Sequence, residues 1–271
     1  MKHVLTIAGS DCSGGAGIQA DMKTFAAHGV YGMSVIVSVV AENTQRVIGA
    51  QDISPTLIAE QLQAVFEDIR VDAVKIGMLP SPAIMACVAE NLERRRPRNI
   101  VLDPVMIAKN GYPLMDSRLA ETLVALVFPL VDVVTPNIPE AEVLANMTIS
   151  STEAMETAAR IIHAYGPRYV VLKGGHRSDD AADLLYDGNT MHWLRAKRIE
   201  TKNTHGTGCT FSSAIAANLA MGKPIDDAVR DAKAYVTMAI AHALTIGKGC
   251  GPTHHFHDLY KYGLPRQGAQ K

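Results

Sequence analysis

Short apolar runs rich in β-branched residues alternate along the chain with longer segments of helical periodicity, and this alternation restricts the fold more than any other feature. The apolar runs predict buried strands at residues 4–8, 35–40, 73–76, 100–102, 131–135 and 169–172. The periodic segments predict helices at residues 17–28, 54–69, 81–96, 118–127 and 152–165. This order is typical of an α/β protein with a mostly parallel central sheet and helices on both faces.

The C-terminal third of the chain departs from this alternation. Residues 182–186 and 191–197 predict a small antiparallel β-hairpin, because the favoured turn pair Asp187-Gly188 lies between them. Two helices are expected after the hairpin, at residues 209–221 and 225–245, with a Gly-Lys-Pro turn between them. The hairpin therefore extends the sheet, and the two helices complete the layers that cover it.

Composition limits the partners of the chain. The 26 basic and 27 acidic residues are interspersed and give a net charge of −1, which argues against nucleic acid. Apolar segments stay shorter than the roughly 18 to 20 residues that a membrane span needs, so no membrane partner is expected. Neither a linker nor an internal repeat interrupts the pattern. We expect one domain over residues 1–263 and a polar C-terminal tail at residues 264–271.

The cysteines indicate a cellular compartment. Cys12, Cys87, Cys209 and Cys250 have neither the spacing of a zinc site nor that of a redox pair. Met1 leads at once into an apolar run that is too short for a signal peptide. Both observations favour the reducing cytoplasm.

Residues 203–211, with the sequence Asn-Thr-His-Gly-Thr-Gly-Cys-Thr-Phe, open directly onto a helix of small residues. The first N–H groups of a helix lack intrahelical acceptors, and glycine lets an anion approach them. We therefore expect Gly206, Thr207, Gly208 and Cys209 to bind a phosphoryl group. The same N–H groups should favour the Cys209 thiolate, which would assist proton removal from an alcohol or line the pocket. A glycine-rich turn capped by Thr207 is the structural alternative.

Four polar residues follow predicted strands. Asp103, Asn137, Glu140 and Lys173 each come just after one, and parallel strands present their carboxyl ends at one edge of a sheet. Carboxylate and amide oxygens suit Mg²⁺, and a lysine meets phosphate as a point charge. Each residue alone is as consistent with a helix cap or a surface group, but their convergence predicts a site.

An oxidoreductase is the competing enzyme class. Residues 15–20 fit the dinucleotide fingerprint, and Glu42 lies where a ribose-binding carboxylate is expected. Two observations argue against this interpretation. Residues 9–14 insert a longer loop before the fingerprint, and the predicted phosphate-binding residues 206–208 would have no role in an oxidoreductase. The Walker A lysine motif is also absent, so a nucleotide must be held in another way. NAD(P)-dependent chemistry stays open as an alternative.

Segments spread from about residue 3 to residue 257 carry a family resemblance. They are residues 6–11, 13–21, 75–79, 103–106, 135–137, 140, 173–176, 203–209, 251–252 and 255–257. Together, and in this order, they closely resemble the hydroxymethylpyrimidine/phosphomethylpyrimidine kinases of thiamin biosynthesis, which belong to the ribokinase-like superfamily.

The resemblance implies a ribokinase-like three-layer sandwich, a homodimer, and ATP with Mg²⁺ as cofactors. The implied reaction phosphorylates 4-amino-5-hydroxymethyl-2-methylpyrimidine and then its monophosphate to the diphosphate. The implied anion hole is Gly206, Thr207, Gly208 and Cys209, where Cys209 replaces the aspartate base of sugar kinases. The implied nucleotide ligands are Lys173, Asn137, Glu140, Thr207 and Lys233, and the metal ligands are Asp103 and Glu140. The implied pyrimidine contacts are Asp11, Ala16, Gly17, Val40, Glu42, Met78 and Val105.

One of these residues departs from the family pattern. The family usually has glutamine in an Ala-Gln-Asn-Thr segment where this chain has Glu42. An amide both donates and accepts hydrogen bonds, whereas an ionised carboxylate only accepts. Glu42 therefore requires a raised pKa, a protonated pyrimidine ring or a different substrate.

Two alternatives share the fold. Related pyridoxal kinases carry a second cysteine in the lid that follows Asp-Pro-Val-Met, and this chain has Ala108 there. That difference favours the pyrimidine kinase, with pyridoxal phosphorylation as a secondary activity. An inactive pyrimidine-binding sensor is the non-enzyme alternative, and the intact set of Asp103, Glu140, Lys173 and residues 206–209 argues against it.

Overall fold

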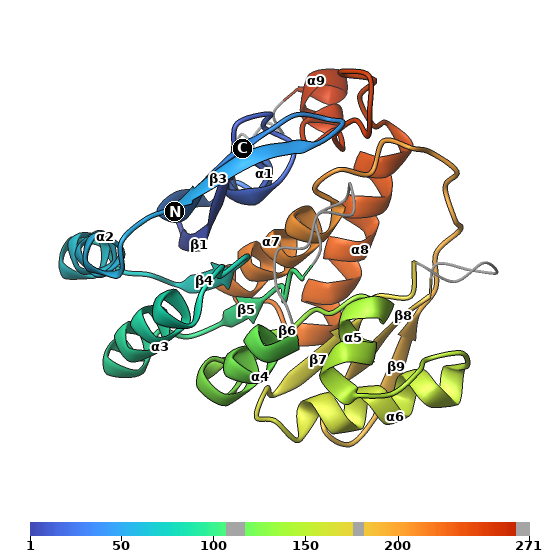
Figure 1. Ribbon diagram of the computed structural model, residues 1–271. Helices are drawn as coiled ribbons and strands as arrows, with labels where there is room; N and C mark the ends of the chain where they lie inside the picture. The colour runs from blue at the N-terminus through green and yellow to red at the C-terminus, as the bar shows by residue number, and fades with distance from the viewer. Residues whose placement is uncertain (107–116, 176–181, 264–271) are drawn as a thin grey trace, which may run out of the picture.

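A nine-stranded sheet forms the centre of the molecule in a computed structural model that describes residues 1–106, 117–175 and 182–263 (Figure 1). The strand order is β3-β2-β1-β4-β5-β6-β7-β8-β9. Neighbouring strands from β2 to β7 pair in parallel, and β3, β8 and β9 pair antiparallel. The strands are β1 (His3–Asp11), β2 (Tyr31–Glu42), β3 (Val47–Asp52), β4 (Ala73–Ile76), β5 (Ile100–Leu102), β6 (Val133–Val134), β7 (Tyr169–Leu172), β8 (Asp183–Tyr186) and β9 (Met191–Leu194).

Helices cover both faces of this sheet. They are α1 (Gly17–Ala27), α2 (Pro55–Asp68), α3 (Pro82–Arg95), α4 (Ser117–Leu126), α5 (Ile138–Ala145), α6 (Thr152–His163), α7 (Thr207–Ala220), α8 (Ile225–Ala241) and α9 (His257–Tyr262), with a 3-10 turn η1 (Phe128–Leu130) after α4. One apolar core lies between the sheet and α2 to α6, and a second lies between the sheet and α1, α7 and α8 (Figure 1). The three-layer α/β sandwich and the hairpin β8–β9 are confirmed.

Local chemistry explains where several helices begin. Ser54, Ser81 and Ser151 each accept a hydrogen bond from the backbone N–H three residues later, which satisfies one of the free donors at a helix start. Pro55 and Pro82 follow two of these caps in the first turn, where the missing N–H of proline has no cost. These helix starts were therefore predictable from short segments.

The structure contains elements that the sequence pattern did not predict. Strand β3 is exposed along most of its length, so it lacks the apolar alternation of a half-buried strand. Helix α5 begins in a proline-rich segment that reads equally well as a turn. The short helix α9, which begins at His257, was not among the expected helices either.

Some predicted boundaries were wrong. Helix α7 begins at Thr207 rather than at residue 209, so Thr207 and Gly208 lie within its first turn. Helix α8 ends at Ala241 rather than at residue 245. Strand β6 is limited to Val133–Val134 and is shorter than the predicted range of residues 131–135.

Two predictions concern residues outside the described ranges, namely Ala108 in the lid and the tail at residues 264–271. Within those ranges, the helices are too short or too polar to cross a bilayer.

The parallel strands bring distant polar residues to one edge of the sheet. Strand β1 ends at Asp11 and β2 ends at Glu42, while Asp103 follows β5 and Lys173 follows β7. The strand order also reverses direction between β1 and β4. Ligands of open α/β sheets bind outside the carboxyl ends of the strands at such a switch point. The fold therefore places a binding site at this edge.

Candidate active site

One cavity of about 1250 Å³ opens at the carboxyl edge of the parallel strands. Every residue that the sequence assigned to the pyrimidine, the nucleotide, the metal and the anion hole lines it. A cavity of this size accommodates two small ligands side by side. The predicted residues are thus brought together in one place, although they are spread over most of the chain.

The N-terminus of α7 forms one wall of this cavity. Gly206 has φ +77°, and a side chain there would overlap the carbonyl oxygen of Gly15, so the position requires glycine. The N–H of Thr210 donates to the Gly206 carbonyl oxygen at 2.8 Å. The N–H groups of Gly208 and Cys209 precede it in the first turn and have no acceptor among the described residues. They form the anion-binding end of the helix.

Thr207 does not cap this helix, contrary to the structural alternative. It is the first helical residue, and its hydroxyl donates to the carbonyl oxygen of Thr204 at 2.8 Å instead of accepting from the first turn. Gly206 occupies the N-cap position and has no side chain to offer. The loop therefore leaves N–H groups free that a capping side chain would have used.

The thiol of Cys209 does not behave as the sequence predicted. Burial raises its pKa to about 11, although the positive charge of Lys75 and the N–H of Gly17 act in the opposite direction. The negative charges of Asp21 and Asp103 raise it further. The expectation of a favoured thiolate is therefore wrong for the ligand-free site, because desolvation outweighs the helix N-terminus.

Lys173 connects the anion hole to two acidic side chains. Its Nζ lies 2.8 Å from Asp103 Oδ1 and 3.9 Å from Glu140 Oε2. A Cβ built on Gly208 would lie 3.1 Å from Asp103 Oδ2 and 3.5 Å from Lys173 Nζ. The first turn of α7 therefore faces an ammonium and a carboxylate across a short gap.

Asn137 and Glu140 have a structural role as well as a place in the cavity. The Glu140 N–H donates to Asn137 Oδ1 at 2.9 Å, and the Asn137 N–H donates to Glu140 Oε2 at 2.8 Å. This capping box begins α5, so the interpretation of both residues as caps is also correct. Burial raises the pKa of Glu140 to about 7, with Asp103 adding to the shift and Lys173 opposing it.

The carboxylate oxygens of Asp103 and Glu140 are suitable ligands for a magnesium ion. Asp103 and Glu140 both lie against the same lysine at the edge of the cavity, and both offer carboxylate oxygens. Mg²⁺ prefers oxygen ligands and usually keeps several waters, so one or two carboxylates beside a phosphate site are sufficient.

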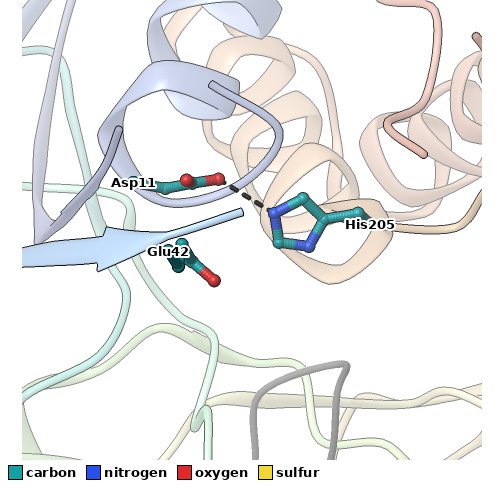
Figure 2. A group of neighbouring side chains, drawn as sticks. All are labelled: Asp11, Glu42 and His205. Carbon is teal, nitrogen blue, oxygen red and sulfur yellow. Dashed lines mark hydrogen bonds and ion pairs between the residues drawn. The ribbon is translucent and has the colours of Figure 1, made fainter. Parts of the chain in front are cut away.

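A third group of side chains lies at the ends of β1 and β2. Asp11 accepts hydrogen bonds from the backbone N–H groups of Ser13, Gly15 and Ala16 at 2.7, 3.0 and 2.8 Å. Its Oδ2 also lies 2.9 Å from Nε2 of His205, which acts as the donor because an ionised carboxylate can only accept (Figure 2). Burial acts to raise the pKa of Asp11, but these hydrogen bonds outweigh it and hold the pKa well below its ordinary value.

Glu42 lies beside the pair of Asp11 and His205 (Figure 2). One ligand atom from each of the three side chains falls within 4.8 Å of the others. A metal ion does not suit this group, because Asp11 Oδ2 already accepts from His205 and two backbone N–H groups. The group is a polar corner of the cavity.

Comparison with known proteins identifies the family. The sequence profile described as phosphomethylpyrimidine kinase matches residues 11–254. The chain belongs to this family. The hydroxymethylpyrimidine/phosphomethylpyrimidine kinase of Rhizobium meliloti is 48% identical over 95% of this chain and 98% of its own length. The thiamine biosynthesis bifunctional protein ThiED of Geobacter sulfurreducens is 50% identical over 93% of this chain, which spans 52% of that longer protein.

Two solved structures resemble this member of the phosphomethylpyrimidine kinase family over most of its length. A Bacillus subtilis pyridoxal kinase in complex with ADP has a TM-score of 0.89 and 40% identity, covering 94% of this chain and 98% of that one. The phosphomethylpyrimidine kinase of Clostridium difficile has a TM-score of 0.80 and 44% identity, covering 89% of this chain and 100% of that one. The predicted family resemblance and the ribokinase-like fold are thus confirmed.

Family membership and local geometry both argue against a dinucleotide site at residues 15–20. The N–H groups of Gly15 and Ala16 donate to the carboxylate of Asp11, so they are not available to a pyrophosphate. Glu42 faces Asp11 and His205 and belongs to the same polar corner. Residues 15–20 match the dinucleotide fingerprint because they form a tight glycine-rich loop. In this member of the phosphomethylpyrimidine kinase family, the carboxylate of Asp11 occupies the place that a bound pyrophosphate would take.

The sequence did not assign a role to a buried ion pair beneath the site. Lys75 is fully buried, lines the cavity and lies 3.0 Å from Asp21 Oδ2. Asp21 also accepts hydrogen bonds from Thr6 and Ser213, at 2.6 and 2.7 Å. Burial lowers the pKa of Lys75, but the charge of Asp21 outweighs it and raises the pKa above its ordinary value. A lysine within the otherwise apolar strand Ala73–Ile76 was the available signal.

Lys233 is a further lysine that lines the cavity. Its Nζ lies 2.7 Å from Asp183 Oδ2, and Asp183 Oδ1 accepts the N–H of Gly174. This pair joins α8 to the start of β8 and keeps a second ammonium group at the cavity wall.

Proposed function

We propose that this chain transfers a phosphoryl group from ATP to the hydroxymethyl group of 4-amino-5-hydroxymethyl-2-methylpyrimidine, and then phosphorylates the monophosphate to the diphosphate for thiamin biosynthesis. One observation carries the proposal. The free N–H groups of α7, the ammonium of Lys173 and an apolar compartment all open into the same cavity. The printed names of the relatives agree with this reaction.

The proposed pyrimidine site is the part of the cavity near β1 and β2. Four side chains supply its apolar walls, namely Ala16, Val40, Met78 and Val105. Asp11, Gly17 and Glu42 supply the polar contacts, with Asp11 near the hydroxymethyl arm. An apolar pocket with a few convergent polar groups suits a small heteroaromatic ring.

The proposed phosphoryl site lies between this compartment and the nucleotide. The N–H groups of Gly208 and Cys209, within the loop Gly206–Cys209, bind the moving phosphoryl group, and Lys173 offsets its charge. The nucleotide extends toward Thr207, Asn137 and Lys233, which line the same cavity. Phosphoryl transfer requires mainly positioning and electrostatic stabilisation, which these groups supply.

Asp103 and Glu140 would hold Mg²⁺ in this proposal. When bound, the ion neutralises charge on the nucleotide phosphates. Lys173 keeps both carboxylates close to the phosphoryl path, because it contacts each of them.

Cys209 is the proposed base for the substrate hydroxyl, and its removal tests the role. Because the pKa of the thiol is raised to about 11, only a small fraction is ionised near neutral pH, and the wild-type kcat should rise with pH. We expect Cys209→Ala to lower kcat by about 10²-fold or more with a modest change in pyrimidine binding. Steady-state kinetics across pH and calorimetric binding measure both. Near-normal turnover would show that the thiol is not a required base.

The function itself is tested by ATP consumption and product analysis with the pyrimidine, its monophosphate and pyridoxal side by side. Diphosphate formation from the pyrimidine series is the expected result. Pyridoxal is the second candidate substrate, because the Bacillus subtilis pyridoxal kinase is so similar in structure. Turnover of pyridoxal alone would assign the chain to that activity, and pyrimidine binding without turnover would indicate a sensor.

We also propose that a single domain over residues 1–263 acts in the cytoplasm as a homodimer. The ribbon of β2 and β3 supports the dimer, because Ile48 is 69% exposed, Val39 is 47% exposed and β3 is a sheet edge. We expect Ile48→Lys to shift the protein from dimer to monomer in light scattering after size exclusion. A wild-type monomer, or a dimer that Ile48→Lys leaves intact, would exclude this interface.

A further inference from the structure

The residue that departs from the family pattern occupies a distinctive place in the cavity. Glu42 is the last residue of β2, and Val40, two residues earlier, shares its face of the strand and lines the same wall. Val47 pairs with Glu42 from β3 and also lines the cavity. A half-buried carboxyl group therefore stands at the polar corner of an otherwise apolar compartment.

Charged and titratable groups face Glu42 from two other elements. Asp11 faces it from β1 and His205 from the loop before α7. Cys12, next to Asp11, contacts the backbone of Glu42 through its sulfur, at 3.1 Å from the carbonyl oxygen. On β3 the facing residue is the apolar Val47. Among the described residues, Asp11 and His205 are thus the side chains whose charges act on Glu42.

Asp11 remains ionised beside Glu42. It accepts three backbone N–H groups and the His205 Nε2–H, so a proton on Asp11 would break several hydrogen bonds. His205 donates its Nε2 proton to Asp11 in this hydrogen bond, so the same proton is not available to Glu42. The carboxyl oxygens of Asp11 and Glu42 lie within 4.8 Å of each other at a partly desolvated site. Ionisation of both groups at once is therefore unfavourable. Burial, followed by the charge of Asp11, accordingly raises the pKa of Glu42 to about 7, although His205 lowers it in part.

We propose that Glu42 binds the substrate ring as the neutral carboxylic acid, donating its O–H to a ring nitrogen and accepting the N–H of the adjacent amino group, with ionised Asp11 keeping that proton in the complex. This inference rests on the proposed function, because it specifies how that site selects its ring. The ligand class is a heteroaromatic ring with an amino group beside an unprotonated nitrogen.

The proton balance of this recognition differs from that of an amide. An ionised carboxylate would accept the amino N–H but would face the ring-nitrogen lone pair without a proton between them. Binding above the pKa of Glu42 therefore takes up one proton from solvent, which the carboxyl group of Glu42 holds in the complex. A glutamine donates and accepts without any proton uptake. Glu42 thus couples ring binding to pH, and Glu42→Gln uncouples it.

Calorimetry in buffers of different ionisation enthalpy measures this coupling directly. For the wild type at about pH 8, we expect uptake of close to one proton per pyrimidine bound, and affinity that falls about tenfold between about pH 8 and about pH 9. For Glu42→Gln we expect no proton uptake and a flat affinity over the same range. Glu60→Gln makes the same chemical change on the exposed side of α2 and should match the wild type.

The ligand-free protein offers a second measurement. Because the pKa of Glu42 is raised from 4.5 to about 7 by folding, the folded state takes up a proton between these values and loses stability as pH rises through them. Glu42→Gln lacks this loss, so it should have the higher melting temperature at about pH 8 and equal the wild type near about pH 4. A difference that is independent of pH would contradict the protonation of Glu42.

These outcomes separate the inference from the kinase function. Proton uptake that Glu42→Gln abolishes supports the inference even if no phosphorylated product forms, in which case only the kinase proposal fails. Turnover of the pyrimidine with no proton uptake, or with the same uptake in both proteins, overturns the inference and leaves the kinase proposal standing. Absence of pyrimidine binding in the wild type overturns both.

Discussion

Lys173→Met should lower kcat by roughly 10²- to 10³-fold with the pyrimidine as substrate. The ammonium lies against Asp103 and Glu140 and faces the first turn of α7, where charge develops on the moving phosphoryl group. Methionine keeps most of the side-chain volume and removes the charge. The effect should therefore appear in kcat, and calorimetric binding of the pyrimidine should stay within a few-fold of the wild type.

Lys233→Met is the matched control for this variant. Lys233 also lines the cavity and also pairs with an aspartate, Asp183, at 2.7 Å. The partner, Asp183, lies at the start of β8 and not at the anion hole. We therefore expect Lys233→Met to raise the KM for ATP more than it lowers kcat. Equal losses of kcat in the two variants would show that proximity to α7 does not distinguish the lysines. A Lys173→Met enzyme within about threefold of wild-type kcat would remove this residue from the phosphoryl site.

Lys75→Met should destabilise the folded protein by about 3 to 5 kcal/mol. The side chains of Lys75 and Asp21 are both fully buried, so methionine leaves the charge of Asp21 without its counterion. Thr6 and Ser213 still donate hydrogen bonds to Asp21, but they do not neutralise it. A thermal melt should show a midpoint lower by about 10 °C.

Two further variants test this interpretation of Lys75. Asp21→Asn combined with Lys75→Met removes both charges and should recover part of the loss, because no unpaired buried charge remains. Lys223→Met breaks a short but exposed pair with Asp231 and should change stability by less than about 1 kcal/mol. A Lys75→Met protein as stable as the Lys223→Met protein would contradict a structural role for the buried pair.

The core strands and most helices were predictable because their signals are local. Strands β4, β5 and β7 lie at the predicted residues, since fully buried parallel strands consist of continuous apolar runs. Serine caps followed by proline marked the starts of α2 and α3. Strand β3 escaped prediction because an exposed edge strand is held by its hydrogen bonds to β2 and not by a buried face.

The sequence predicted many of the residues that line the cavity, but not the electrostatics of the site. Residues after parallel strands converge by topology alone, which is why Asp103 and Lys173 were expected together. The pKa of the Cys209 thiol depends on how deeply the fold buries it, and no pattern of neighbouring residues gives that depth. His205 lay within a recognised motif, yet its hydrogen bond to Asp11 spans 194 positions of sequence.

The sequence alone determined the fold class, because apolar periodicity and helix caps are properties of short segments. Its motifs indicated the family, and the resemblance to that family supplied most of the residues expected at the carboxyl edge. The tertiary structure alone decided which charges face one another. It set the ionised Asp11 beside Glu42, paired Lys75 with Asp21 beneath the cavity and desolvated the thiol of Cys209. Protonation depends on desolvation and on charges brought close in space, and both exist only once the chain has folded.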